Sequence, residues 1–308
     1  MTEVNELFTL LGNETRRRIL EVLWEHFDYS LYVTETQEGI RFADLRDGAD
    51  VNDPGNFNYH LNKLQGTFIE STPDGYVLSP LGYNIMRSIE RYESFEYSTR
   101  GPWTLPDPCP YCEDFLRARY HREVLEVSCP GCDGMGRDGN FTFVQIPLTG
   151  SDALENSALL DIAILRLQER VTTSKFGYCW DCTGPIEISV QICQEHQQSD
   201  EHSCPDCMNR YRATASIACS TCGTSGFGPL IEYAIASPRV KDVFASAESG
   251  PQDIGPWRYR LLALDGAQET VETTNEPVMQ FRFETACSET EIEIREADSI
   301  GLQINPLS

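Results

Sequence analysis

Five C-x-x-C pairs constrain this chain more than any other feature of its sequence. They hold ten of the 12 cysteines and begin at Cys109, Cys129, Cys179, Cys204 and Cys219. Each such turn offers two thiolates, and two turns close a tetrahedron around a soft divalent ion. In a reducing cytosol this pattern favours metal ligation over disulfides. The sequence therefore predicts zinc sites with a structural role.

The first predicted site is a zinc ribbon within residues 105–150. Sixteen residues separate its two cysteine pairs, and they read as two short strands over 115–120 and 124–127. Two knuckles joined by a hairpin are typical of a zinc ribbon. The predicted ligands are Cys109, Cys112, Cys129 and Cys132.

Two further sites are predicted between residues 179 and 222. The second site repeats the paired arrangement with Cys204, Cys207, Cys219 and Cys222. A third site combines Cys179, Cys182, Cys193 and His196, so Cys287 is the only cysteine that is not assigned to a predicted site. Two alternatives stay open for this third site: His202 replaces His196, or Cys193 is buried and unligated. Because every position of each site is a protein ligand, no vacancy for catalysis remains, and we expect no enzyme.

Residues 54–64 form the most informative helix expected in the N-terminal part. Asp53 can cap its start, and Pro54 fits the first helical position. Phe57, Leu61 and Leu64 recur at helical spacing and give one apolar stripe. The outer face carries amides, a phenol and a cation: Asn56, Asn58, Tyr59, Asn62 and Lys63. Such groups can contact bases and phosphates of DNA, although a solvated face is the simpler interpretation.

The elements expected around this helix follow the order of a winged helix-turn-helix. Helices are expected over 3–11 and after Asn13, which can cap the second helix. A short strand at 40–42 and a helix from 42 follow. After helix 54–64 comes a hairpin whose turn is Pro73-Asp74-Gly75, and then a helix from Pro80. Three arginines at 16–18 lie near the start of the second helix, facing either phosphate or solvent.

Three segments carry a resemblance to a known family. They are LGNETRRRIL at 11–20, YHLNKL at 59–64 and YVLSPLG at 76–82. The N-terminal part resembles the ArsR-like winged helix-turn-helix regulators, here of the haloarchaeal type. The resemblance implies a homodimer that places helix 54–64 in the major groove of double-stranded DNA. By position, Asn56, Asn58 and Tyr59 would face bases, and Lys63 and Arg16 would face phosphates.

The resemblance is incomplete in one respect. Metal-sensing members of that family carry a Cys-x-Cys motif in the helix before the recognition helix. Here that segment reads FADLRD at 42–47, without Cys or His. We therefore expect any sensing function to reside elsewhere in the chain.

Charge sets a second constraint. The net charge is −24, and only three of the 24 basic residues are lysines. This composition is typical of a cytosol of very high salt, where carboxylates hold hydration and repulsion is screened; an ordinary acidic protein is the alternative. Residues 1–95 alone carry a net charge of −8. DNA binding by such a domain would have to depend on base contacts and DNA shape more than on counterion release.

The expected fold class is α+β, with four regions. These are a winged helix-turn-helix over 1–98, a zinc ribbon over 105–150, a long helix plus a cysteine-rich module over 151–228, and a mostly β region over 229–308. The long helix is expected at 151–173. In the last region strands are expected at 229–236, 256–264, 278–285, 289–295 and 300–304, with a helix at 238–247. The G-x-G-x-x-G run at 134–139 precedes a strand, so it is interpreted as a turn and not as a dinucleotide loop.

The leading hypothesis is a sequence-specific transcriptional regulator whose zinc-braced C-terminal part binds an effector or a protein partner. A winged helix with a zinc ribbon also resembles the archaeal general transcription factor E, which contacts RNA polymerase and promoter. A thiol redox protein is the third reading, since C-x-x-C pairs can be reactive dithiols. No secretory leader or membrane span is expected, and the protein is predicted to be cytoplasmic.

Overall fold

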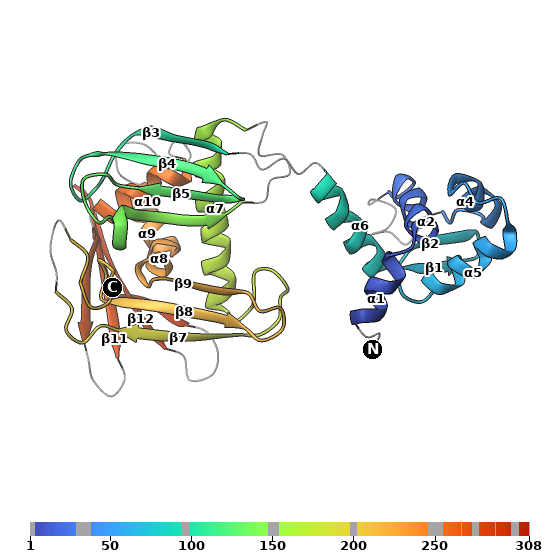
Figure 1. The fold of residues 1–308 in the computed structure, drawn as a ribbon. Helices are drawn as coiled ribbons and strands as arrows, with labels where there is room; N and C mark the ends of the chain where they lie inside the picture. The colour runs from blue at the N-terminus through green and yellow to red at the C-terminus, as the bar shows by residue number, and fades with distance from the viewer. Residues whose placement is uncertain are drawn as a thin grey trace. The chain divides into compact units, whose positions relative to one another are not determined.

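The structure is a computed structural model that describes residues 4–28, 38–93, 99–146, 154–197, 202–245, 255–265, 267–272, 277–286, 288–296 and 302–307. Helices and antiparallel sheets both contribute, so the fold class is α+β. The chain divides into two compact units, Met1–Glu96 and Tyr97–Ser308, which we call unit 1 and unit 2 (Figure 1). None of the described helices combines the length and apolar character that crossing a bilayer requires.

Unit 1 is a small helical domain with one hairpin. Its elements are α1 (Val4–Leu11), α2 (Glu14–Glu25), α4 (Phe42–Gly48), α5 (Pro54–Leu64), β1 (Ile69–Thr72), β2 (Gly75–Leu78) and α6 (Pro80–Glu93). One apolar core joins them, and its fully buried centre includes Ile19, Leu45, Phe57 and Leu61. The strand expected at 40–42 is reduced to a single bridge between Ile40 and Tyr76, because α4 already begins at Phe42.

Side-chain caps fix where the helices of unit 1 begin. Asn13 Oδ1 accepts a hydrogen bond from the Arg16 amide at 3.2 Å. Asp53 Oδ1 accepts one from the Gly55 amide at 2.8 Å, and Pro54 follows at the first helical position. Both caps were predicted from the sequence and are confirmed. Such caps satisfy amides that have no partner within the helix.

Unit 2 begins with a four-stranded antiparallel sheet. Its strands are β3 (Arg100–Pro108), β4 (Phe115–His121), β5 (Val124–Ser128) and β6 (Asn140–Gln145), in that order. The predicted ribbon strands are confirmed as the hairpin β4–β5. The segment 134–139 is a turn that continues into the short 3₁₀ helix η1 (Arg137–Gly139) and leads into β6, so the expected turn is confirmed only in part. A Cβ at Gly139 would clash with the Cys129 carbonyl oxygen.

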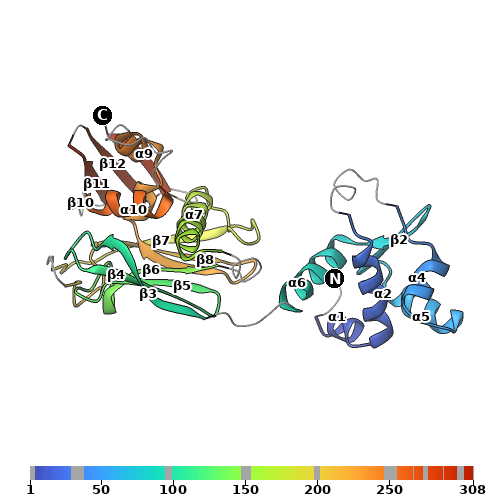
Figure 2. The same cartoon turned by 90° about the horizontal axis from the view of Figure 1, so that it is seen from above.

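A long helix connects this sheet to the next one. Helix α7 spans Asn156–Lys175, so it begins later than predicted, although residues 151–153 lie outside the described part. The second sheet contains β7 (Ile186–Ile192), β8 (Ala213–Cys219) and β9 (Ser225–Pro229), all antiparallel. In both views α7 lies beside α10 (Pro256–Asp265), and it also packs on β6 (Figures 1 and 2).

The C-terminal region combines three helices with a third sheet. The helices are α8 (Ile231–Ile235), α9 (Pro238–Ala245) and α10, and the sheet is a meander of β10 (Ala267–Glu272), β11 (Val278–Glu284), β12 (Glu289–Glu296) and β13 (Leu302–Leu307). The strands predicted at 278–285 and 289–295 are confirmed. The strand expected at 300–304 lies two residues later, and Cys287 falls outside the described residues.

Two predicted strands in this region are wrong. Residues 231–235 and 256–265 form helices α8 and α10. Every residue of α8 is buried, and α10 buries residues on several sides, so neither run shows a helical stripe. Short apolar runs of this kind do not distinguish a buried helix from a buried strand.

Candidate metal centres

All twelve predicted metal ligands come together in three groups of four. We call them site A (Cys109, Cys112, Cys129, Cys132), site B (Cys179, Cys182, Cys219, Cys222) and site C (Cys193, His196, Cys204, Cys207). Within each site the ligand atoms lie within 4.8 Å of one another. The eleven cysteines concerned are free thiols.

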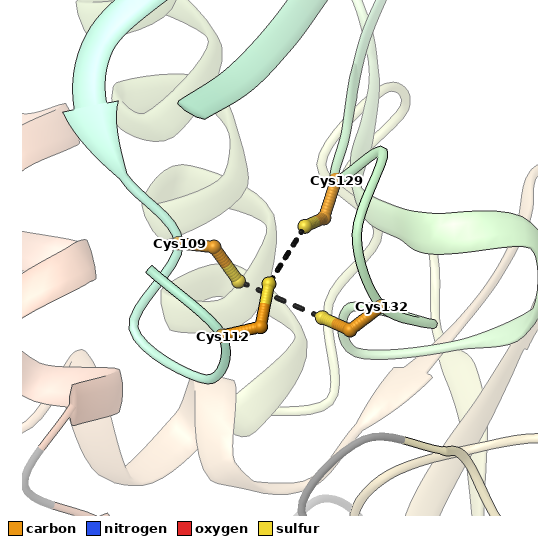
Figure 3. Close-up of side chains that lie close together, drawn as sticks. All are labelled: Cys109, Cys112, Cys129 and Cys132. Atoms are coloured by element: carbon orange, nitrogen blue, oxygen red, sulfur yellow. Dashed lines mark hydrogen bonds between the residues drawn. The ribbon is translucent and has the colours of Figure 1, made fainter. Parts of the chain in front are cut away.

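Site A closes the base of the β4–β5 hairpin. One knuckle lies between β3 and β4 and the other follows β5, so their sulfurs converge (Figure 3). The Sγ atoms of Cys109 and Cys132 are 3.7 Å apart, and those of Cys112 and Cys129 are 3.3 Å apart. A disulfide would require about 2.05 Å. Tetrahedral zinc with bonds of about 2.3 Å separates its sulfurs by about 3.8 Å, so the spacing fits zinc much better.

Backbone amides point at the sulfurs of these knuckles. In site A, the amides of Tyr111, Gly131 and Gly134 donate to Cys109, Cys129 and Cys132, each at 3.4 Å. The amides of Asp181 and Gly184 do the same in site B. Hydrogen bonds of this kind favour the thiolate, which is the form that binds metal.

Sites B and C occupy opposite ends of the hairpin β7–β8. Site B gathers the knuckle before β7 and the knuckle that ends β8, with Sγ separations of 3.7 Å (Cys179–Cys222) and 3.6 Å (Cys182–Cys219). Site C gathers the residues after β7 and the knuckle before β8. In site C the Cys193 and Cys204 sulfurs are 4.0 Å apart, and Cys207 Sγ lies 3.4 Å from His196 Nδ1.

This partition corrects the sequence prediction for two of the three sites. The predicted second site joined Cys204 and Cys207 to Cys219 and Cys222, but these pairs flank the two ends of β8. Seven strand residues span roughly 20 Å, which no single ion can bridge. Antiparallel pairing instead brings the start of β7 beside the end of β8. Of the two alternatives for the histidine ligand, His196 is the one present in site C, whereas His202 Nδ1 lies 3.6 Å from Asp133 Oδ2.

The thiols of site C differ in electrostatic environment. Burial opposes ionisation of Cys204, yet the amides of Cys207 and Gln197 outweigh it and lower the pKa of this thiol. Burial raises the pKa of Cys207. Bringing both sulfurs onto one metal ion therefore requires the ion to displace a proton from Cys207.

Sites A and C are braced against each other by polar contacts. The Ser203 amide donates to Asp133 Oδ2 at 2.9 Å, and the Arg210 amide donates to the Met135 carbonyl at 3.0 Å. The hydroxyls of Tyr111 and Tyr211 are 3.0 Å apart in the interior. Burial raises the pKa of Tyr111 to about 12 and raises the pKa of Tyr211 well above its usual value, so both phenols stay neutral at ordinary pH. Four protein ligands per site and mutual bracing both fit a structural role.

The residues predicted to contact DNA lie on the outer face of α5. Asn56, Asn58, Asn62 and Lys63 are exposed, and the Tyr59 side chain is 57% exposed. Phe57, Leu61 and Leu64 are fully buried beneath them, as the stripe predicted. Lys63 Nζ lies 6.0 Å from the centre of the Tyr59 ring, so cation and ring share one side of the helix. Whether this face contacts DNA stays a prediction.

Arg16 has a role that the sequence did not reveal. Its Nε and Nη2 donate to the carbonyls of Leu10 and Thr9, both at 2.6 Å, and so cap the end of α1. The predicted contact of Arg16 with phosphate therefore depends on the rest of the guanidinium. The neighbouring Arg17 and Arg18 pair with Glu21 and Glu14 along α2.

Sequence reasoning missed a buried ion pair in unit 2. Arg260 on α10 contacts Glu232 on α8 with an N–O distance of 2.6 Å, and both side chains are at least 90% buried. Arg260 Nη2 also donates to the Phe141 carbonyl at 2.9 Å. Both residues lie in runs whose sequence pattern predicts strands, and 27 residues separate them, so no local pattern indicates the pair.

Each of the two units matches a known family model. A family model described as Domain of unknown function (DUF7351) matches residues 106–299, more than half of the chain. The chain belongs to this family. The DUF7351 match includes all three metal sites and the Arg260–Glu232 pair. A second model, Domain of unknown function (DUF7347), matches residues 4–89, which include α5. No curated protein and no solved structure matches the chain.

Proposed function

We propose that this protein is a DNA-binding transcriptional regulator. Unit 1 acts as a winged helix-turn-helix of the ArsR-like type, and α5 is its recognition helix. The DUF7351 region is the effector or partner module, and three structural zinc ions hold it together. The supporting observation is the composition and exposure of the outer face of α5.

That face carries groups suited to base recognition. Asn side chains can pair bidentately with the major-groove edge of adenine, and Tyr or Lys can reach bases or phosphates. The helix contains no acidic residue from Pro54 to Leu64, although residues 1–95 have twice as many acidic as basic residues. A helix face free of carboxylates within an acidic unit avoids direct repulsion of the phosphate backbone. The hairpin β1–β2 follows α5 along the chain, as the wing follows the recognition helix in a winged helix-turn-helix.

The acidity of the rest of the unit fits a high-salt setting. Counterion release contributes less to DNA binding as salt rises, and base contacts then carry more of the affinity. We therefore propose that Asn58 and Tyr59 contribute to sequence selection, whereas Lys63 contributes little nonspecific electrostatic attraction to DNA. Dimer formation, as in helix-turn-helix regulators, would supply two such helices per operator.

Selection from random duplexes tests the proposal. The full-length protein, in multimolar KCl, is expected to enrich one sequence motif. The variant Asn58→Ala/Tyr59→Ala is expected to lose this enrichment while its thermal unfolding and zinc content remain unchanged. The matched control is Asn84→Ala, which removes an exposed amide from α6 of the same unit and should retain the motif.

Two results would contradict the proposal. One is the absence of any enriched motif with wild-type protein that is folded and zinc-loaded. The other is unchanged enrichment by the double variant, which would remove α5 as the recognition helix.

A further inference from the structure

Unit 2 contains a cavity of about 520 Å³ between its first two sheets and the helices that pack on them. Its walls come from β6, from α7, α8 and α10, from β9, and from the residues that follow the Cys204–Cys207 knuckle. Ligand cavities in proteins typically have this volume and a mostly apolar wall with few polar groups. The apolar part of this wall includes Phe143, Val144, Leu167 and Phe227.

Two aromatic side chains stand at this cavity with much of their surface exposed. Phe143 is 65% exposed and Phe227 is 62% exposed, and they come from β6 and β9. Met208, which is 43% exposed, lines the same cavity. Aromatic and thioether groups that line a cavity yet remain open to solvent can cover an apolar molecule on binding.

The polar residues that line the cavity include the charged pair Arg260 and Glu232, besides the neutral Asn140, Thr142 and Asn209. Arg260 Nε and Nη2 are occupied by the Glu232 carboxylate, the Phe141 carbonyl and the Met135 sulfur. Arg260 Nη1 is buried and has no hydrogen-bond partner among the residues that the structure describes. A buried donor without a partner is unfavourable, so this nitrogen favours a ligand that brings an acceptor.

Charge balance decides what kind of acceptor fits. Glu232 already neutralises Arg260 at 2.6 Å, and no second arginine or lysine is among the described residues that line the cavity. A carboxylate ligand would add an unbalanced charge beside the Glu232 carboxylate. A carbonyl oxygen can accept from Nη1 without that penalty.

We propose that this cavity is a binding site for an uncharged, mostly apolar small molecule that carries a carbonyl oxygen. The apolar body lies against Phe143, Phe227 and Leu167, and the carbonyl oxygen accepts a hydrogen bond from Arg260 Nη1. The site adjoins site C through Cys207 and Met208. This inference does not depend on the DNA-binding role of unit 1.

Fluorescence titration of the full-length, zinc-loaded protein with the naphthyl ketone prodan tests the site. Saturable binding of one equivalent with a blue-shifted emission is expected. In competition, acetylnaphthalene should bind three- to tenfold more tightly than ethylnaphthalene. This difference in affinity corresponds to the contribution of about one hydrogen bond. Naphthoate should compete more weakly than the ketone. Equal binding of ketone and hydrocarbon, or tighter binding of naphthoate, would overturn the proposed chemistry.

Variants locate the site. Gly228 lines the cavity, and a Cβ added there meets no atom within 4 Å, so Gly228→Leu should fill the cavity and weaken prodan binding at least tenfold. Phe227→Ala should weaken binding, whereas the control Phe176→Ala, which removes an equally exposed ring outside the cavity, should not. The paired variant Glu232→Gln/Arg260→Met should abolish the preference for ketone over hydrocarbon. Unchanged binding by a folded, zinc-loaded Gly228→Leu variant would overturn the location.

Discussion

Ile186 lies directly opposite Cys219 in the antiparallel pair β7–β8. This register brings the knuckle that precedes β7 beside the knuckle that ends β8, and the Cys182 and Cys219 sulfurs approach to 3.6 Å. At the other end Ile192 lies opposite Ala213, and the Cys193 amide donates to the Arg212 carbonyl at 3.0 Å. One strand pairing therefore determines the ligands of two metal sites.

Metal analysis of the native protein should find about three zinc ions per chain. The three sites offer eleven sulfurs and one histidine nitrogen, so X-ray absorption at the zinc edge should show mainly sulfur with a minor nitrogen contribution. Zinc-free protein with reactive dithiols would instead favour the redox interpretation.

The partition of ligands has its own test. Cys182→Ser and Cys219→Ser each disrupt site B, so their combination should cost the protein one zinc ion, as each single variant does. The control Cys182→Ser/Cys204→Ser disrupts sites B and C and should cost two. Loss of two ions by the Cys182→Ser/Cys219→Ser pair would contradict the observed grouping, because it would place these two cysteines in different sites.

Removing zinc should affect the two units differently. All twelve ligands belong to unit 2, whereas unit 1 has an apolar core of its own. Treatment with a strong chelator should therefore increase amide hydrogen exchange around the knuckles and in β4, β5, β7 and β8. Exchange in α2 and α5 should stay slow. Equal loss of protection in both units would show that folding of unit 1 depends on the metal sites.

The Arg260–Glu232 pair should be far more sensitive than a surface pair. Glu232→Gln leaves a buried guanidinium without its counter-charge, and we expect a loss of about 3–5 kcal/mol in the free energy of unfolding. Glu126→Gln removes the partner of Arg119 on an exposed surface and should cost less than about 1 kcal/mol. Urea unfolding at saturating zinc measures both. The charge-free pair Glu232→Gln/Arg260→Met should recover much of the loss.

The sequence is informative where a single element determines the outcome. The cap at Asp53 and the stripe of Phe57, Leu61 and Leu64 follow from local spacing, and the structure confirms both. Ligand identity likewise follows from the C-x-x-C and C-x-x-H spacings, because each knuckle is local. These features need no knowledge of how distant segments pack.

Features that depend on tertiary contacts were not predicted correctly. The grouping of knuckles depends on the pairing of β7 with β8, and β7 was not recognised as a strand. Helices α8 and α10 are buried on several sides, so their periodicity is hidden. Arg16 provides a smaller example, since its capping of α1 depends on the angle between two helices.

Genome-wide occupancy in cells grown at their native salt concentration tests the central claim most directly. We predict that the protein occupies a limited set of sites sharing one sequence motif, and that Asn58→Ala/Tyr59→Ala abolishes this occupancy at equal protein level. Occupancy of nearly all promoters would instead indicate a general transcription factor. Absence of occupancy, or a pattern unchanged by the double variant, would contradict the assignment of α5 as a DNA-reading helix.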